Sequence, residues 1–257
     1  YLLPKAREGF RLGHQQVVDS LVHDGLWDPY HQQHMGTCAE QCAQKYRLTR
    51  EHQDAYAAES FRRANAAQRE GRVAQELTPV DVTDARGKVT RVGADEGPAK
   101  VNYEKIPTLK PVFDPAGTIT AANASTINDG AAVLVLATAE TARARGCRPL
   151  ARIVAFGAHA QDPVWFTTAP VSATQNALKR AGWGSDEVDL WEVNEAFAVV
   201  PLAFMRELGV PHEKLNVRGG AISLGHPIGC SGARIVVTLL AALRERGARR
   251  GLATICI

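Results

Sequence analysis

The sequence predicts a fold of the α/β class, in which strands and helices alternate along the chain. From residue 117 to the end, short apolar runs typical of buried strands alternate with segments of helical periodicity. The apolar residues between 235 and 243 recur at spacings of three and four, as on one face of a helix. Pro170 suits the first turn of a helix, and Gly146 and Gly182 suit helix ends. This alternation is typical of layered α/β folds.

The N-terminal part, up to about residue 118, is more polar and predicts helices and turns. Thr37 and Glu40 have the spacing of a capping box, which predicts a helix that runs through Tyr46. Thr49 predicts the N-cap of a second helix. One face of this second helix would carry Tyr56, Ser60, Phe61 and Ala64. Residues 87–100 are rich in glycine, proline and charge, and they predict a surface loop or hairpin.

The rest of the chain carries the predicted strands and the helices between them. The strand-like runs are 118–125, 131–138, 150–156, 188–193 and 252–257. The helical segments are 138–145, 170–181, 194–208 and 228–247. This order of elements predicts helices layered on a sheet.

Composition excludes several classes of protein. The chain has 257 residues, of which 45% are hydrophobic and 22% charged, so it can bury a core of ordinary size. A net charge of +3 is too small to predict nucleic-acid binding. No apolar run approaches the roughly 20 residues of a membrane span, and the start has no signal-peptide pattern. The five cysteines include no C-x-x-C pair, so we expect no metal site and a reducing, cytoplasmic location.

A glycine-rich stretch from Asn216 to Arg234 surrounds a single histidine, His226. Glycines permit backbone angles and close approaches that other residues cannot make. Pro227 favours an extended conformation at His226. The sequence therefore predicts that His226 lies on an irregular turn between a strand and the N-terminus of a helix. The alternative is a glycine-rich connector with a surface histidine. A P-loop is excluded, because no Lys-Ser/Thr pair follows the glycines.

Three segments carry a resemblance to a known family. They are VNEAF at 193–197, GGAISLGHPIGCSGAR at 219–234 and LATICI at 252–257. In this order and spacing they closely resemble the C-terminal half of the thiolases, acyl-CoA acyltransferases that form or cleave 3-ketoacyl-CoA. Segments 1–7, 34–40, 50–60 and 121–132 are also similar to thiolase segments. The resemblance extends over essentially the whole chain.

The resemblance implies a layered αβαβα fold built from two similar halves, incomplete in this chain. Residues 1–126 would form the loop domain, which covers the active site and binds coenzyme A. Residues 127–148 would be a returning part of the N-terminal half, and 149–257 the C-terminal half without its last strand. We expect the chain to be a fragment that lacks the half-domain with the nucleophilic cysteine. Thiolases are typically homodimers or homotetramers.

The resemblance also assigns roles to three residues. Cys256 would be the base that exchanges a proton with the carbon of acetyl-CoA, with a thiol pKa lowered by its neighbours. Its alternative is an ordinary buried cysteine. His226 would activate the nucleophilic cysteine and donate a hydrogen bond to the thioester oxygen. Asn194 would hold a water that completes the oxyanion hole, and from the sequence alone it is also a candidate N-cap of the helix at 194–208.

Further residues resemble positions that contact coenzyme A or the acyl group. Ser125 matches a serine that contacts the pantetheine, and its alternative is a helix cap. The positions that match the lining of the pantetheine and acyl pocket are Leu26, Met35, Phe113 and Phe197. His34 with Met35 resembles the acetoacetyl-CoA type. Coenzyme A and acyl-CoA would be substrates, and no cofactor is implied.

Two other functions stay open at this point. A ketosynthase belongs to the same superfamily, but its usual HGT segment is absent here. The chain could also be a non-catalytic remnant that binds coenzyme A.

Overall fold

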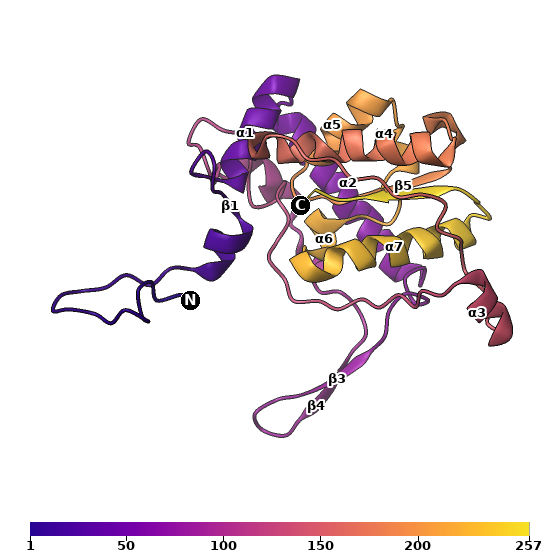
Figure 1. Ribbon diagram of the computed structural model, residues 1–257, viewed down its shortest axis with the longest axis horizontal. Coiled ribbons are helices and arrows are strands. Elements are labelled where there is room, and N and C mark those ends of the chain that lie inside the picture. Colours follow the sequence, from indigo (N-terminus) through magenta and orange to yellow (C-terminus); the bar gives the residue numbers. More distant parts are fainter. Residues whose placement is uncertain (257) are drawn as a thin grey trace.

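A parallel pair of strands, β5 (Leu190–Val193) and β6 (Gly251–Thr254), lies at the centre of the fold. The computed structural model describes residues 1–256. Helix α7 (Ile228–Glu245) packs on the strands, and Figure 1 shows it on the opposite side from α4 (Ala169–Ala181) and α5 (Val199–Leu208). Every residue of β5 is buried, as expected for a parallel strand that is covered on both faces. The predicted α/β class is confirmed.

The core forms where β5 meets α5. Trp191 on β5 is 1% exposed, and its ring meets Phe204 of α5 edge to face, with centroids 5.7 Å apart. Such a pair adds about 0.5–1.5 kcal/mol to the burial of its area. The parallel connection from β5 to β6 passes through α5, the short α6 (Ala221–Leu224) and α7. This connection brings α6 close to the ends of both strands (Figure 1).

Two N-terminal helices pack beside this core, α1 (Met35–Tyr46) and α2 (Arg50–Arg69). The predicted N-cap of α2 is confirmed, since the Thr49 side chain accepts from the His52 backbone N–H. The predicted capping box of α1 is wrong. His34 caps this helix by accepting from the Gly36 backbone N–H. The Glu40 carboxylate accepts instead from the backbone N–H of residues 118 and 119.

The remaining elements lie at the edges. Strands β1 (Trp27–Asp28) and β2 (Gln33–His34) form a short antiparallel pair. Strands β3 (Val80–Thr83) and β4 (Val89–Val92) form a hairpin that projects from the body in Figure 1, so a hairpin in this region is confirmed. Helix α3 (Ala139–Ala144) is short. A π-type turn spans Leu21–Gly25, and 3-10 turns span Pro98–Lys100, Tyr103–Thr108, Pro163–Thr168, Ser185–Glu187 and His212–Lys214.

Three of the predicted strands are wrong, those at 118–125, 131–138 and 150–156. Residues 131–138 and 150–156 take no strand pairing, and their apolar side chains are exposed, with Val135 at 93% and Phe156 at 76%. A strand needs a neighbour for its backbone groups, and sequence pattern shows only the propensity. The run at 118–125 is a turn closed by the Asn123 side chain, which accepts from the Thr120 backbone N–H.

Other predicted boundaries shift. The helix predicted at 194–208 begins at Val199, because residues 194–198 form a loop after β5. The last strand ends at Thr254, and residue 257 of the predicted run lies outside the described residues. Gly182 does end a helix, with φ +69° at the C-cap of α4. No helix in the described part of the chain has the length and apolarity that a membrane crossing requires.

Candidate active site

The candidate catalytic residues Asn194 and Cys256 follow the carboxyl ends of the two central strands. Asn194 comes directly after β5, and its backbone N–H donates to the Thr254 carbonyl at the end of β6 (3.0 Å). Cys256 lies two residues after Thr254, the last residue of β6. Ligands of open α/β sheets bind at this edge, outside the carboxyl ends of the strands. The register of β5 and β6 therefore brings both residues to the edge where a substrate is expected.

His226 lies on the turn between α6 and α7. Gly225 has φ +95°, a backbone angle that residues with a side chain rarely adopt, and this angle turns the chain after α6. The His226 backbone N–H donates to the Thr126 carbonyl (2.9 Å). The predicted irregular turn before a helix is confirmed, but a short helix precedes it where we expected a strand.

The His226 imidazole is held by side chains at both ring nitrogens. Its Nε2 lies 3.1 Å from the Asn194 amide Nδ2. Its Nδ1 lies 2.6 Å from the Ser231 hydroxyl, which is also 3.0 Å from the Pro227 carbonyl. With the Asn194 amide as donor, Nε2 accepts and Nδ1–H donates to Ser231. A hydroxyl both donates and accepts, so Ser231 can also support the other tautomer, in which Nε2 carries the proton.

Burial favours the neutral form of His226, and the neighbouring Asn194 side chain has an oxygen without a hydrogen-bond partner in the described part of the chain. Burial, with a smaller effect of the Arg234 charge, lowers the pKa of His226 below its ordinary value. Asn194 is fully buried, and its Oδ1 has no hydrogen-bond partner among the described residues. A buried carbonyl without a partner is costly unless a bound molecule donates to it. The position of Asn194 after a strand rules out the predicted N-cap role, because α5 begins at Val199.

Cys256 is a buried thiol. It is 7% exposed and belongs to the main core together with Phe197 and Val193. Burial raises the pKa of Cys256 to about 12, opposite to the lowering that we expected. The sequence could not show this direction, because it does not reveal how deeply the thiol is buried. At neutral pH Cys256 therefore carries its proton, which it can deliver to a carbanion.

His34 and the four residues predicted to line the pocket form one cluster near this site. The rings of His34 and Phe113 stack with centroids 4.8 Å apart, and Phe113 meets Phe197 edge to face at 6.2 Å. Met35 packs against the same core, and its backbone N–H donates to the Leu26 carbonyl (2.9 Å). Five residues from three separate segments are thus brought together. Burial lowers the pKa of His34, which favours its neutral form.

Ser125 connects this region to the loop that carries Asn194. Its hydroxyl donates to the Ala196 carbonyl (2.9 Å), as does its backbone N–H (3.0 Å). Neighbouring Ala124 forms an isolated bridge with Phe197. The hydroxyl caps no helix, so the alternative role for Ser125 is wrong. Its predicted contact with pantetheine stays a prediction.

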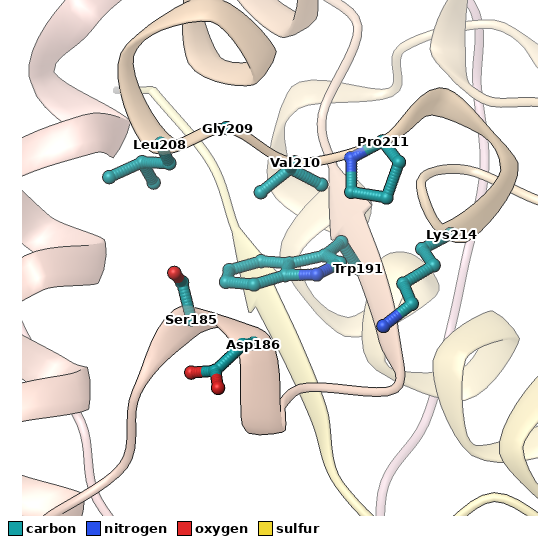
Figure 2. A pocket seen from close by; sticks show the side chains of 8 residues that line it. All are labelled: Ser185, Asp186, Trp191, Leu208, Gly209, Val210, Pro211 and Lys214. Carbon is teal, nitrogen blue, oxygen red and sulfur yellow. The ribbon is translucent and has the colours of Figure 1, made fainter.

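Of two surface hollows, one adjoins the candidate site. It has a volume of about 390 Å³ and is lined by residues 128–132 and 227–230, next to His226. The other, of about 230 Å³, lies around Trp191, between the turn at 185–186 and residues 208–211 (Figure 2). None of the predicted site residues lines this second hollow. Among the described residues, no group of three or more His, Cys, Asp or Glu side chains could hold a metal ion.

Comparison with protein families identifies the class. The family model of the thiolase N-terminal domain matches residues 1–140, and that of the thiolase C-terminal domain matches 147–257. The chain therefore belongs to the thiolase family, and the ketosynthase alternative is set aside. The residue pair Asn194–His226 and the thiol of Cys256 lie within the C-terminal match.

Within this family, the chain is similar to several acetyl-CoA acetyltransferases. The chain is 50% identical over 256 residues to acetyl-CoA acetyltransferase 2 of Arabidopsis thaliana. This match covers 99% of the present chain and 64% of the Arabidopsis protein. It is 49% identical over 258 residues to the acetyl-CoA acetyltransferase of Pseudomonas aeruginosa, covering 100% of this chain and 66% of that protein. The crystal structure of the Bacillus anthracis acetyl-CoA acetyltransferase matches with a TM-score of 0.96 and 41% identity, over 100% of this chain and 65% of that chain. The fold is thus that of the thiolases, and the chain spans about two thirds of the length of these relatives.

Two buried residues at the site escaped the sequence reasoning. Ser231 contacts His226 directly, and Glu195 lies next to Asn194 in the chain. A serine in the first turn of the helix after His226 was a usable signal for the first. Glu195 has no such signal in the sequence, and only the structure shows which groups surround it.

Proposed function

We propose that the protein containing this chain is a thiolase that cleaves acetoacetyl-CoA with free coenzyme A and forms it from acetyl-CoA. One observation carries the proposal: Asn194 and His226 meet at the carboxyl edge of the strands that also leads to Cys256. The names of the relatives support the choice of substrate, since they are acetyl-CoA acetyltransferases.

His226 and Asn194 would stabilise the oxygen of the thioester as negative charge develops on it. For this step Nε2 must carry the proton, so it no longer accepts from the Asn194 NH₂ group and is free to donate to the substrate oxygen. Ser231 supports that tautomer by donating its hydroxyl proton to Nδ1. The free Oδ1 of Asn194 can accept from a water that donates to the same oxygen. Removing a single donor of this kind commonly costs about 10²–10³ in kcat.

Cys256 would serve as the acid in cleavage and as the base in synthesis. In cleavage the acyl-carrying cysteine attacks the keto carbon and keeps the acetyl group, which then passes to free coenzyme A. The electron pair of the broken carbon–carbon bond remains on the acetyl-CoA carbon, and the Cys256 thiol protonates this carbon to complete the methyl group. Synthesis is the reverse: Cys256 removes the proton, and the resulting enolate attacks the enzyme-bound acetyl group. The raised pKa supports the acid role, because a thiol must be protonated to donate.

We further propose that the acyl-carrying cysteine lies outside residues 1–257. An activated cysteine has a lowered pKa. Burial raises the pKa of Cys38 and of Cys42 to about 11, and both lie inside α1. Cys230 also has a raised pKa through burial, and it lies in α7. These environments support structural roles for the three thiols. The remaining cysteine, Cys147, is exposed after α3; its thiol donates to the Arg145 carbonyl (3.7 Å), and no basic side chain is among its hydrogen-bond partners in the described structure.

The division into a loop domain (1–126), a returning segment (127–148) and a C-terminal half (149–257) stays a prediction. The homodimeric or homotetrameric assembly and the cytoplasmic location also stay predictions. So do the pocket roles of six residues: Leu26, His34, Met35, Phe113, Ser125 and Phe197. The five free cysteines of the described structure fit a reducing compartment. The proposed chemistry uses coenzyme A and acyl-CoA as substrates, with no cofactor.

The test is a thiolysis assay of the protein produced from the complete reading frame that contains these residues. Acetoacetyl-CoA and a long-chain 3-ketoacyl-CoA are compared with the same concentration of coenzyme A. A preference for acetoacetyl-CoA supports the proposal. A preference for the long chain overturns the substrate, and no turnover of either supports the alternative of a non-catalytic remnant.

A further inference from the structure

The Glu195 carboxylate is completely buried and is surrounded by hydrogen-bond donors. Its Oε1 accepts from the Tyr56 hydroxyl and from the Asn216 amide, both at 2.8 Å. Its Oε2 accepts from the Ser60 hydroxyl at 2.8 Å and from the Ile222 backbone N–H at 3.1 Å. The four donors come from α2, from the turn that contains residue 216, and from the first turn of α6.

These hydrogen bonds join the two segments that carry the catalytic pair. Glu195 follows Asn194 directly in the chain. Ile222 lies in α6, and the chain leaves α6 through Gly225 to reach His226. The loop of one partner is therefore attached to the helix that leads to the other. The side chains of the pair meet at 3.1 Å, so a small shift of either segment would separate them.

The backbone at Gly220 packs directly on the same carboxylate. A Cβ atom at this position would lie 2.4 Å from the carboxyl carbon of Glu195, which is closer than real Cβ contacts allow. The Gly220 backbone N–H donates to the Ser60 hydroxyl, which itself contacts Glu195. The start of α6 is thus fixed by both shape and hydrogen bonding to Glu195.

Only a carboxylate suits this set of neighbours. It accepts at both oxygens, whereas a glutamine would place an NH₂ group against donors. Burial and the nearby Glu195 charge raise the pKa of Tyr56 well above its usual range, so Tyr56 remains a donor. A buried donor that faces another donor loses its partner, and this costs about 1–3 kcal/mol.

We propose that Glu195 is a positioning residue: its carboxylate fixes the loop of Asn194 to α6 and thereby sets the contact between Asn194 and His226. The role of this contact in catalysis rests on the proposed thiolase function. The role of Glu195 in holding the contact does not, because the contact and the hydrogen bonds of Glu195 are present in the described structure.

The test compares Glu195→Gln with Glu40→Gln in the protein from the complete reading frame. Glu40 is a matched control, since it is 4% exposed and its carboxylate accepts from residues 118 and 119 but from no residue of the Asn194 loop or of α6. Both variants are compared with wild type by thermal unfolding, and activity is measured where all are folded. We expect Glu195→Gln to lower kcat for acetoacetyl-CoA by about tenfold or more with little change in KM. Glu40→Gln is expected to lose stability without this change in kcat.

A second readout does not need activity. The ¹⁵N chemical shifts of the His226 imidazole report its tautomer and its titration by NMR. We expect Glu195→Gln to make the His226 titration more like that of an exposed histidine, while Glu40→Gln leaves it as in wild type. If Glu195→Gln fails to fold, Tyr56→Phe removes one donor, and the same NMR change is expected on a smaller scale.

The outcomes separate the two proposals. An unchanged His226 titration and unchanged kcat in folded Glu195→Gln would overturn the positioning role. An equal fall of kcat in both variants would show a general effect of stability and would also overturn it. If wild type has no thiolase activity but the His226 titration changes in Glu195→Gln, the proposed function fails and the positioning role stands.

Discussion

The hydrogen bond between Ser231 and His226 offers a sensitive test of how the imidazole is held. Ser231→Ala removes the hydroxyl that lies 2.6 Å from Nδ1 and is itself 1% exposed. A buried nitrogen left without its partner costs about 1–3 kcal/mol. We expect this cost to fall on the state in which Nε2 carries the proton, because alanine cannot donate to Nδ1.

The free energy converts into a rate. A cost of about 1–3 kcal/mol corresponds to about a 5- to 150-fold smaller fraction of correctly held imidazole. We therefore expect kcat of thiolysis to fall by about this factor, with KM for acetoacetyl-CoA nearly unchanged. The assay is steady-state thiolysis in the protein from the complete reading frame, at a pH above the lowered pKa of His226.

Thr238→Ala is the matched control. Thr238 is 4% exposed and lies further along the same helix, where Arg234 donates to its hydroxyl at 3.4 Å. Both variants delete one buried hydroxyl of α7, so similar losses of stability are expected. A Ser231→Ala enzyme with wild-type kcat, or a Thr238→Ala enzyme with the same loss of kcat, would show that the Ser231 hydroxyl does not hold the imidazole for catalysis.

Two further predictions concern buried acidic groups. Cys256→Ala should leave acylation of the enzyme measurable but lower the rate of carbon–carbon bond formation by about 10²–10⁴. The acyl-enzyme is trapped to measure acylation, and condensation is measured separately. A near-normal rate of condensation would show that Cys256 is only a core residue. Burial raises the pKa of Glu192 from 4.5 to about 8, so the folded state holds a proton that the unfolded state releases above pH 4.5. Stability should therefore fall as pH rises from 4.5 to 8, by up to about 1.4 kcal/mol per pH unit, and Glu192→Gln should flatten this slope in chemical unfolding; an unchanged slope would show that Glu192 does not titrate in this range.

The elements with strong local signals could be predicted from the sequence. The Thr49 cap, the glycine at the end of α4 and the buried strand at β5 depend on neighbouring residues, and all three are found. The runs at 131–138 and 150–156 show the limit. Their pattern is that of strands, but pairing depends on which other segment lies beside them, and they remain exposed.

The residues of the candidate site could be predicted from the sequence, but the protonation of Cys256 and the hydrogen bonds that hold the site could not. The order and spacing of the motifs pointed to Asn194 and His226, which the structure brings into contact. The direction of the Cys256 pKa could not be predicted, because it follows from burial by distant segments. The role of Glu195 likewise depends on Tyr56 and Ser60 of α2, which are far away in the sequence.

In the proposed function, the pair Asn194–His226 supports thiolase chemistry. The most direct measurement is the yield of acetyl-CoA from acetoacetyl-CoA and coenzyme A, for wild type and His226→Ala side by side, in the protein from the complete reading frame. We expect wild type to form acetyl-CoA and His226→Ala to form it more slowly by about 10²–10⁴. No acetyl-CoA from wild type, or an equal rate in the folded variant, would contradict it.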